Sequence, residues 1–448
     1  MPDETTSTGL DALLARVALL PELADCDVRL YAPDEPRPID LPAALAGALA
    51  RPLGAPPLSE LAKGRRSVVI ITSDATRAVP NRQLLPAVVA ALNEAGIPDD
   101  AIDIVVGPGA HRAATDDELH ALFGREWPSR LRVHNHDCRG EIVSVGVTPA
   151  DNEVLVNPVV AGADLRLALG QVEAHEFAGF TGGPKAILPA VSGYDTIIRN
   201  HSIELTSHPA ARPGVVEGNP IHPEMAAAAR LAGLEFVVNV VLDAGLRPLA
   251  VAAGEPLAAQ AELAGFIRGY AGVSLPDEAP DVVVTGPGVP LDVNLYQTIK
   301  PLVAVEPFVD GETSVVLAAD CVDGTGSREM LLPFEGAKTP ADVLAGLTAD
   351  YTIEKDHAFF IARFLQRCPT VIAVCPGVGD ADLRRLWFEP AVSVDEAVRR
   401  AIGRARRRSR RARPIVYLLP RPQRALFQRR GDRQNADLTL TETERSQP

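Results

Sequence analysis

The sequence predicts an α/β protein of two domains, each with a mostly parallel sheet flanked by helices, and with an active site in the cleft between them. Two observations lead to this prediction. The chain has 448 residues, which is more than one hydrophobic core usually organises. Along it, short apolar runs bounded by turn formers alternate with helical patterns, and this alternation is typical of parallel sheets.

The first strand, helix and strand in this order are predicted at residues 67–74 (SVVIITSD), 81–96 and 101–109. A further strand at 164–172 leads into a segment, 173–201, in which glycines and prolines prevent a long helix. We therefore expect that segment to form active-site loops.

A proline-containing acidic stretch indicates a domain boundary near residue 275. We expect an N-terminal catalytic and cofactor-tethering domain at 1–275, a C-terminal domain at 276–425 and a flexible tail at 426–448. The second domain is predicted to hold strands at 281–285, 314–320, 370–376 and 414–420 and helices at 356–367 and 393–406.

Composition excludes several classes of protein. A formal net charge of -14 argues against a nucleic-acid binder, and the arginine-rich segment at 403–414 is interpreted as the solvated face of a helix. The five cysteines show neither metal nor disulfide spacing. No signal peptide and no membrane-spanning run is evident. We expect a soluble cytoplasmic protein with no nucleic-acid or membrane partner.

Four polar residues follow the predicted ends of the first two strands: Asp74, Thr76, Arg77 and His111. Ligands normally bind at the carboxyl ends of parallel strands. Arg77 can grip a carboxylate through two hydrogen bonds, and the imidazole of His111 can exchange protons near neutral pH. The competing interpretation is that Asp74 and Arg77 form a surface ion pair that contributes little.

The densest group of reactive side chains is His175, Lys185 and His201, which lie among glycines that permit a close approach to a ligand. Each taken alone fits a structural histidine or a surface lysine, and their coincidence favours function. His134 and His136 have metal-like spacing, but alternate residues of a strand share a face, so we interpret this pair as structural or as residues that support the direct ligands of a site.

The second half contributes Tyr296 and Lys300, four residues apart and on one face if this piece is helical. A phenol and an ammonium would suit a hydroxy-carboxylate. The Gly-Pro-Gly that follows the strand at 281–285 lacks the full glycine fingerprint of dinucleotide sites, which makes dinucleotide binding a weak inference.

Five motifs, SDATR, GAHR, HEFAGFTGGPK, the following NH and NLYQTIK, occur here in an order and spacing that resemble the nickel-pincer lactate racemase family. The resemblance extends from about Val68 to about Pro420. Its most specific part is the HEFAGFTGGPKAILP block. The resemblance implies an isomerase that racemises or epimerises a small 2-hydroxy acid.

The resemblance also implies a cofactor, a nickel-pincer nucleotide (a pyridinium-3,5-bisthiocarboxylic acid mononucleotide that holds nickel), made by maturation enzymes of the host. Lys185 would tether it through a thioamide and His201 would ligate the nickel, as imidazole readily does. Asp74 and Thr76 would lie at the cofactor. Hydride transfer from the α-carbon would then give a planar 2-oxo acid.

The same matching implies roles for the remaining residues. His111 and His175 would exchange the hydroxyl proton from opposite faces of the substrate. Arg77, Tyr296 and Lys300 would hold its carboxylate and oxygen.

The chain departs from the family pattern at two places. Residues 189–193 read PAVSG where the family usually has PGVAG, and His357 stands where lactate racemases tend to carry a tryptophan. The second change leaves open which 2-hydroxy acid is the substrate. Two alternatives also remain from the bare residues: a lyase or aldolase that uses Lys185 as a Schiff-base amine, and a non-catalytic protein that binds an organic acid.

Overall fold

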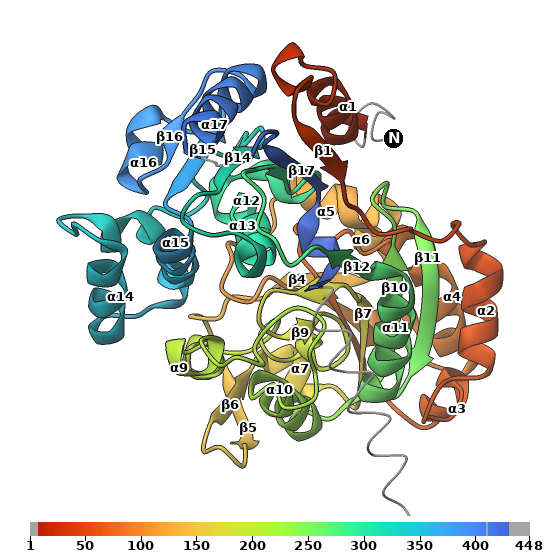
Figure 1. Cartoon of the computed structure of the whole chain (residues 1–448). Helices are drawn as coiled ribbons and strands as arrows, with labels where there is room; N and C mark the ends of the chain where they lie inside the picture. Colours follow the sequence, from red (N-terminus) through yellow and green to blue (C-terminus); the bar gives the residue numbers. More distant parts are fainter. Residues whose placement is uncertain (1–7, 409–410, 430–448) are drawn as a thin grey trace, which may run out of the picture. The chain divides into compact units, whose positions relative to one another are not determined.

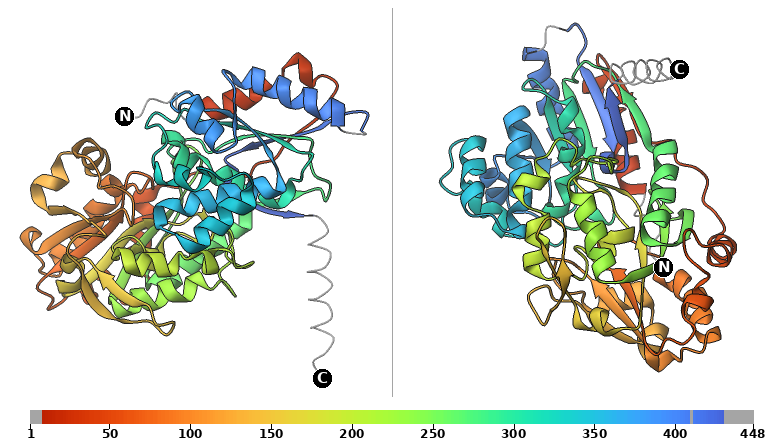
Figure 2. Two further views of the ribbon diagram at one scale, coloured as in Figure 1. Left: turned by 90° about the vertical axis from the view of Figure 1, so that its left-hand side faces the viewer. Right: turned by 90° about the horizontal axis from the view of Figure 1, so that it is seen from below.

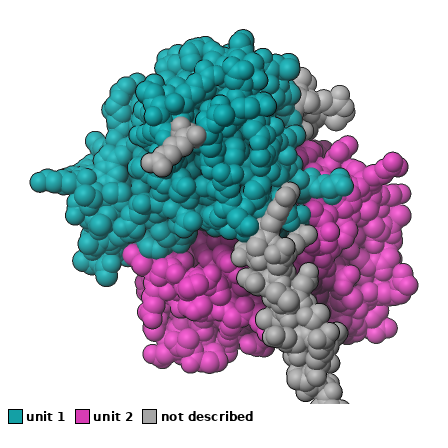
Figure 3. Space-filling view, viewed as in Figure 1, with its two compact units in different colours: residues 1–34, 271–448 teal, residues 35–270 magenta. Residues whose placement is uncertain are grey.

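The computed structural model describes residues 8–408 and 411–429 of the chain. It has two compact units, the described parts of Met1–Asp34 with Ala271–Pro448 (unit 1) and Glu35–Tyr270 (unit 2), which Figure 3 colours separately. Each unit contains a six-stranded, mostly parallel sheet with helices packed on it. The predicted α/β class with two domains is confirmed.

The sheet of unit 2 has the strand order β11-β10-β7-β2-β3-β4 (Figure 1). Its strands are β2 (Val68–Ser73), β3 (Ile102–Gly107), β4 (Arg132–Asn135), β7 (Leu165–Gln171), β10 (Leu234–Leu242) and β11 (Pro248–Gly254). Neighbours are parallel except for β10 and β11. The three strands predicted in this half therefore form adjacent members of one sheet, in the order β7, β2, β3.

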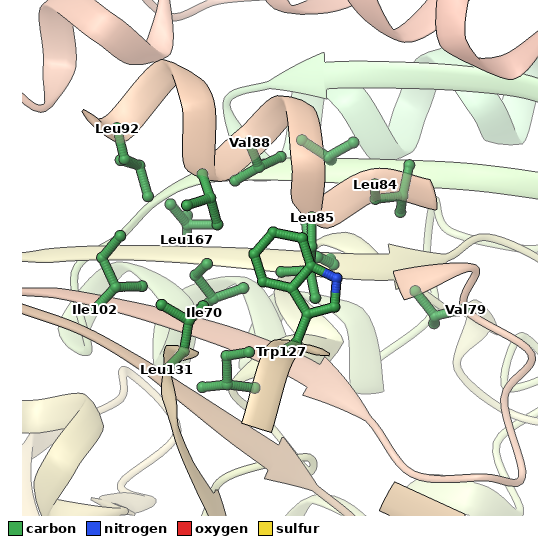
Figure 4. Close-up of a cluster of buried hydrophobic side chains, with 14 of the residues drawn as sticks. Ile70, Val79, Leu84, Leu85, Val88, Leu92, Ile102, Trp127, Leu131 and Leu167 are labelled. Atoms are coloured by element: carbon green, nitrogen blue, oxygen red, sulfur yellow. The ribbon is translucent and has the colours of Figure 1, made fainter. Parts of the chain in front are cut away.

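Helices cover both faces of this sheet (Figures 1 and 2). One face packs against α2 (Leu41–Ala50), α3 (Leu58–Leu61), α4 (Asn81–Glu94), α5 (Asp116–Phe123) and α6 (Glu126–Arg130). Alternate strand residues such as Ile70, Ile102 and Leu167 meet the leucines of α4 and the indole of Trp127 there (Figure 4). Burial of these side chains, at roughly 25 cal/mol per Å² of apolar surface, holds the strand ends in place.

Several further elements of unit 2 do not contribute to this core. These are β5 (Val143–Val147), β6 (Glu153–Val156), α7 (Pro158–Gly162), β8 (Ala174–His175), β9 (Gly179–Phe180), the 3-10 helix η3 (Gly183–Ala186), α8 (Tyr194–Asn200), α9 (Ile203–Thr206) and α10 (Ile221–Leu231). η3 contacts β2, β7 and β10. The predicted loop segment 173–201 thus packs onto the sheet through η3.

The sheet of unit 1 is parallel throughout, in the order β1-β17-β13-β14-β15-β16. Its strands are β1 (Asp27–Leu30), β13 (Val282–Gly286), β14 (Ser314–Ala318), β15 (Thr370–Val374), β16 (Glu389–Pro390) and β17 (Ile415–Pro420). Apolar side chains of α1 (Thr8–Val17) and α17 (Val394–Arg408) form a core with one face of it. The other α-helices of two turns or more in the described part of unit 1 are α14 (Pro340–Ala349) and α15 (Asp356–Arg367), which pack against each other, whereas α11 (Pro256–Ala271) belongs to unit 2 up to Tyr270.

The structure differs from the expected boundaries at both ends of the chain. The segment up to Asp34 clusters with unit 1, because β1 pairs in parallel with β17 through Asp27↔Ile415 to Leu30↔Leu418. Residues 426–429 of the expected tail form a strand, β18, paired with β12 (Gly272–Leu275). The rest of that tail, 430–448, lies outside the described residues.

Residues 403–408 of the arginine-rich segment belong to α17. Arg404 pairs with Glu389, and Arg411 pairs with Glu278 and Asp281, which accounts for two of the segment's cations by ion pairs within the unit. Among the residues at 8–408 and 411–429, no helix is long and apolar enough to cross a membrane.

Candidate active site

The predicted site residues of unit 2 gather at the carboxyl edge of its sheet. Asp74 follows β2, His111 follows β3, and His175 follows β7. Because these three strands are parallel neighbours, their carboxyl ends meet at one edge. The topology therefore brings together residues that lie a hundred positions apart in the chain.

Asp74 and His111 form a hydrogen-bonded pair, with 2.9 Å between Asp74 Oδ2 and His111 Nδ1. The other carboxylate oxygen accepts from the backbone N–H (3.1 Å) and the hydroxyl (2.6 Å) of Thr76. Burial raises the pKa of the Asp74 carboxyl, but His111, Thr76 and Arg77 outweigh it, so the pKa lies below its ordinary value. Asp74 thus remains a carboxylate that orients the imidazole.

Arg77 is half-buried beside a different carboxylate. Its Nε lies 3.4 Å from Glu173 Oε1, and its side chain is 15% exposed. The surface ion pair between Asp74 and Arg77 considered from the sequence is replaced by this contact. Glu173, which the sequence analysis passed over, lies two residues before the motif HEFAGFTGGPK.

Phe177 joins three of the predicted residues. Its ring packs edge-to-face on the imidazole of His175, with centroids 4.6 Å apart, and on that of His201 at 4.9 Å. Lys185 Nζ lies 5.8 Å from the same ring and 3.1 Å from His175 Nε2. His175 and His201 are 5% and 6% exposed. The two buried imidazoles and the partly buried Lys185 therefore form one cluster.

The turn that carries Lys185 is held by two side chains that the sequence analysis did not single out. Asn239 Oδ1 accepts from the backbone N–H of Gly183 (2.8 Å), and Gln260 Nε2 donates to the carbonyls of Thr181 (2.9 Å) and Gly182 (3.1 Å). Gly182 has φ +73°, and a Cβ there would lie 2.6 Å from a methyl group of Val172. Glycine is required because the backbone is left-handed and the packing is close.

The Gly-Pro-Gly turn before His111 packs against the block that follows Lys185. Gly109 N–H donates to the carbonyl of Ala190 (3.0 Å), and a Cβ at Gly107 would lie 2.7 Å from that same oxygen. Ala190 is one of the departures from the family pattern, and its contribution here is a backbone carbonyl. The departure is thus compatible with the contact that links the two segments.

Unit 1 carries the remaining predicted residues on the consecutive short helices α12 (Leu295–Thr298) and α13 (Lys300–Val305). The Tyr296 hydroxyl donates to Asp356 Oδ1 (2.8 Å), and His357 Nδ1 bonds the same oxygen at 2.5 Å. The rings of Tyr296 and His357 stack with centroids 3.6 Å apart at 15°. Lys300 is buried, at 6% exposure.

His134 and His136 have separate structural partners. His134 Nε2 bonds Asp103 at 2.7 Å. His136 Nε2 lies 2.9 Å from the carbonyl of Ser192, and its Nδ1 faces the amide of Asn157 at 3.3 Å. Burial lowers the pKa of His136. Within residues 8–408 and 411–429, no three His, Cys, Asp or Glu side chains are grouped as ligands for a metal ion.

The sequence matches two family models along most of its length. Residues 20–214 match the lactate racemase N-terminal domain and residues 276–413 the lactate racemase C-terminal domain. The chain belongs to the lactate racemase family. The protein is therefore an isomerase, as the resemblance of its motifs implied. This enzyme class takes the place of the two alternatives considered from the bare residues, a lyase and a non-catalytic binding protein.

Two curated relatives of this racemase are lactate racemases. The protein of Thermoanaerobacterium thermosaccharolyticum is 34% identical over 359 residues, 79% of this chain and 83% of the relative. That of Lactiplantibacillus plantarum is 32% identical over 362 residues, 80% of this chain and 85% of the relative.

Two solved structures share the fold of this racemase. The lactate racemase apoprotein from T. thermosaccharolyticum has a TM-score of 0.81 at 30% identity, covering 91% of this chain and 96% of that one. A Thermotoga maritima protein has a TM-score of 0.67 at 15% identity, covering 88% and 100%, and shares the fold alone.

Proposed function

We propose that the enzyme racemises or epimerises a small 2-hydroxy acid such as lactate through a planar 2-oxo acid. The observation that carries this proposal is the cluster of His175, Lys185 and His201 around Phe177, together with the Asp74–His111 pair on the same edge of the sheet. Racemisation needs a proton acceptor and donor for each face of the substrate. Two histidines fulfil that requirement.

The residues of this cluster fit a tethered nickel-pincer nucleotide. Lys185 offers an amine for covalent attachment, and His201 offers an imidazole, a good nickel ligand. No group of three protein ligands is present among the described residues. Most ligands of the nickel would therefore come from the cofactor itself. Enzymes of the host cytoplasm would make this cofactor. When bound, such a group supplies the acceptor and donor for the hydride of the α-carbon.

The proton acceptor whose role is best supported by its contacts is His111. With its Nδ1 proton donated to Asp74, the neutral ring carries its lone pair on Nε2. Nε2 takes the hydroxyl proton of one enantiomer and returns it when the same enantiomer re-forms. Asp74 stabilises the imidazolium formed in between, because its carboxylate remains ionised.

His175 is the proton acceptor and donor for the other enantiomer. Its Nε2 faces Lys185 Nζ at 3.1 Å, and an ammonium has only donors, so the amine competes for the lone pair. Conversion of the amine into a thioamide removes its charge. Attachment of the cofactor would therefore prepare His175 as well as anchor the group.

We propose that Arg77, Lys300 and Tyr296 bind the substrate and that Asp74 and Thr76 lie at the cofactor. The guanidinium and the ammonium are charge-assisted donors for a carboxylate. The Tyr296 proton is donated to Asp356, so toward a ligand its oxygen offers lone pairs and accepts from a hydroxyl. Tyr296 thus suits the substrate alcohol better than the carboxylate.

The test is intact-protein mass spectrometry with nickel quantification on chain purified from cells that make the cofactor. Wild type is expected to carry a covalent adduct with nickel, and Lys185→Ala to lose both. Lys63→Ala, at an exposed lysine of the same unit, is the matched control and keeps both. Loaded wild type should racemise α-deuterated lactate with retention of deuterium. An unmodified, nickel-free wild type despite cofactor supply contradicts the proposal.

A further inference from the structure

Tyr296, Asp356 and His357 form a hydrogen-bonded cluster within unit 1, and the roles proposed so far use only the first of them. One oxygen of Asp356 bonds both the Tyr296 hydroxyl and His357 Nδ1, and the two rings stack. Asp356 and His357 are 6% and 3% exposed. The carboxylate thereby fixes the orientation of both rings.

The other ring nitrogen of His357 has no such partner. Nε2 is buried and makes no hydrogen bond within the part of the chain that the structure describes. Buried side-chain nitrogens are normally paired with protein or water. Since His357 stacks on Tyr296 with ring centroids 3.6 Å apart, a ligand bound to the phenol would lie beside the imidazole of His357.

We propose that His357 determines specificity by hydrogen-bonding, through Nε2, a hydroxyl on the side chain of the 2-hydroxy acid. This inference rests on the proposed racemase activity and on Tyr296 at the substrate. With Nδ1–H directed at Asp356, a neutral ring offers a lone pair at Nε2 and a charged ring offers a proton. A hydroxyl complements both states, whereas a carboxylate needs the charged ring and an ammonium the neutral one.

Lactate and glycerate (2,3-dihydroxypropanoate) are a matched pair for the test, because they differ only by a hydroxyl on C3. Binding of each to the loaded full-length enzyme is measured by calorimetry, and racemisation of each is followed separately by chiral chromatography. Wild type is expected to bind glycerate at least about tenfold more tightly than lactate, since a site with a buried hydrogen-bonding group discriminates against the analogue that lacks the hydroxyl.

His357→Phe keeps a ring to stack on Tyr296 and removes both nitrogens, so it should lose the preference for glycerate over lactate. His357→Gln has an amide that can donate and accept, so it should keep part of the glycerate preference. Comparison of the two variants distinguishes the loss of a hydrogen bond from a loss of folding. Absence of a glycerate preference in wild type, or its persistence in His357→Phe, overturns the inference, as does a wild type that binds neither acid. A preference in binding without racemisation overturns the proposed function alone.

Discussion

His175 Nε2 and Lys185 Nζ lie 3.1 Å apart in one cluster. A histidine proposed to exchange protons and a lysine proposed to carry the cofactor are thus in direct contact. The amine at Nε2 and the backbone N–H of Ala178, 3.3 Å from Nδ1, therefore both influence which ring nitrogen of His175 carries the proton.

Lys185→Gln is expected to abolish racemisation and to change the tautomer of His175. The neutral amide cannot carry the cofactor, and without the ammonium the Nε2 lone pair is no longer held by a hydrogen bond from Nζ, so both ring tautomers become accessible. The ¹⁵N shifts of the His175 ring, compared with unloaded wild type, check the second effect without any activity. Unchanged shifts would mean that the amine does not control the ring.

Asp74→Asn should lower kcat by about 10²- to 10⁴-fold with little change in fold, because an amide no longer fixes the His111 tautomer or stabilises the imidazolium. The pair formed by Asp103 and His134 at 2.7 Å provides the control. Asp103→Asn removes the same type of contact from the same sheet and should leave kcat near that of wild type. Equal losses in the two variants would contradict a role for Asp74 in catalysis.

Acid should remove the stabilisation that Asp74 contributes. Its folded-state pKa lies below the ordinary value of 3.8, so the unfolded chain binds more protons and the contribution to stability is present above pH 3.8. It is lost as the pH falls through the folded pKa. Denaturant unfolding of wild type and Asp74→Asn should therefore give free energies that differ at pH 6 and converge in strong acid. A gap that is constant with pH would exclude this linkage.

Asn239→Ala should impair cofactor loading at Lys185. The change leaves the buried N–H of Gly183 without its 2.8 Å acceptor, at a cost of about 1–3 kcal/mol, and loosens the turn. The fraction of chain that carries the adduct, read by intact mass, should fall, whereas Gln83→Ala on the exposed side of α4 should load fully. Full loading of Asn239→Ala would show that the turn is positioned by other contacts.

Much of the fold follows from local pattern. β2, β3 and β7 are runs of consecutive apolar residues bounded by turn formers, and they were predictable because both faces of a parallel strand are buried. β1 was missed because it is four residues long and half-buried. Its partner β17 begins at Ile415, a separation along the chain that no local signal reports.

In the candidate site, too, some residues were predictable from the sequence and others were not. Asp74 and His111 were candidates because each follows a strand, but their pairing with each other, rather than that of Asp74 with Arg77, appears only in the structure. Asn239 and Gln260 are ordinary polar residues of a strand and a helix, and nothing in their surroundings in the sequence marks them. Asp356 stands next to His357 in the sequence, yet its link to Tyr296 spans sixty residues.

The sequence by itself determined the fold class, the family and the reactive residues, because strand periodicity, glycine turns and the motifs around Lys185 are local features of the chain. Only the tertiary structure decided which charges neutralise one another, which nitrogen of each histidine faces a partner, and which unit receives the first strand. These outcomes depend on the parallel register of strands distant in sequence, and that register follows from burying both faces of each sheet at once.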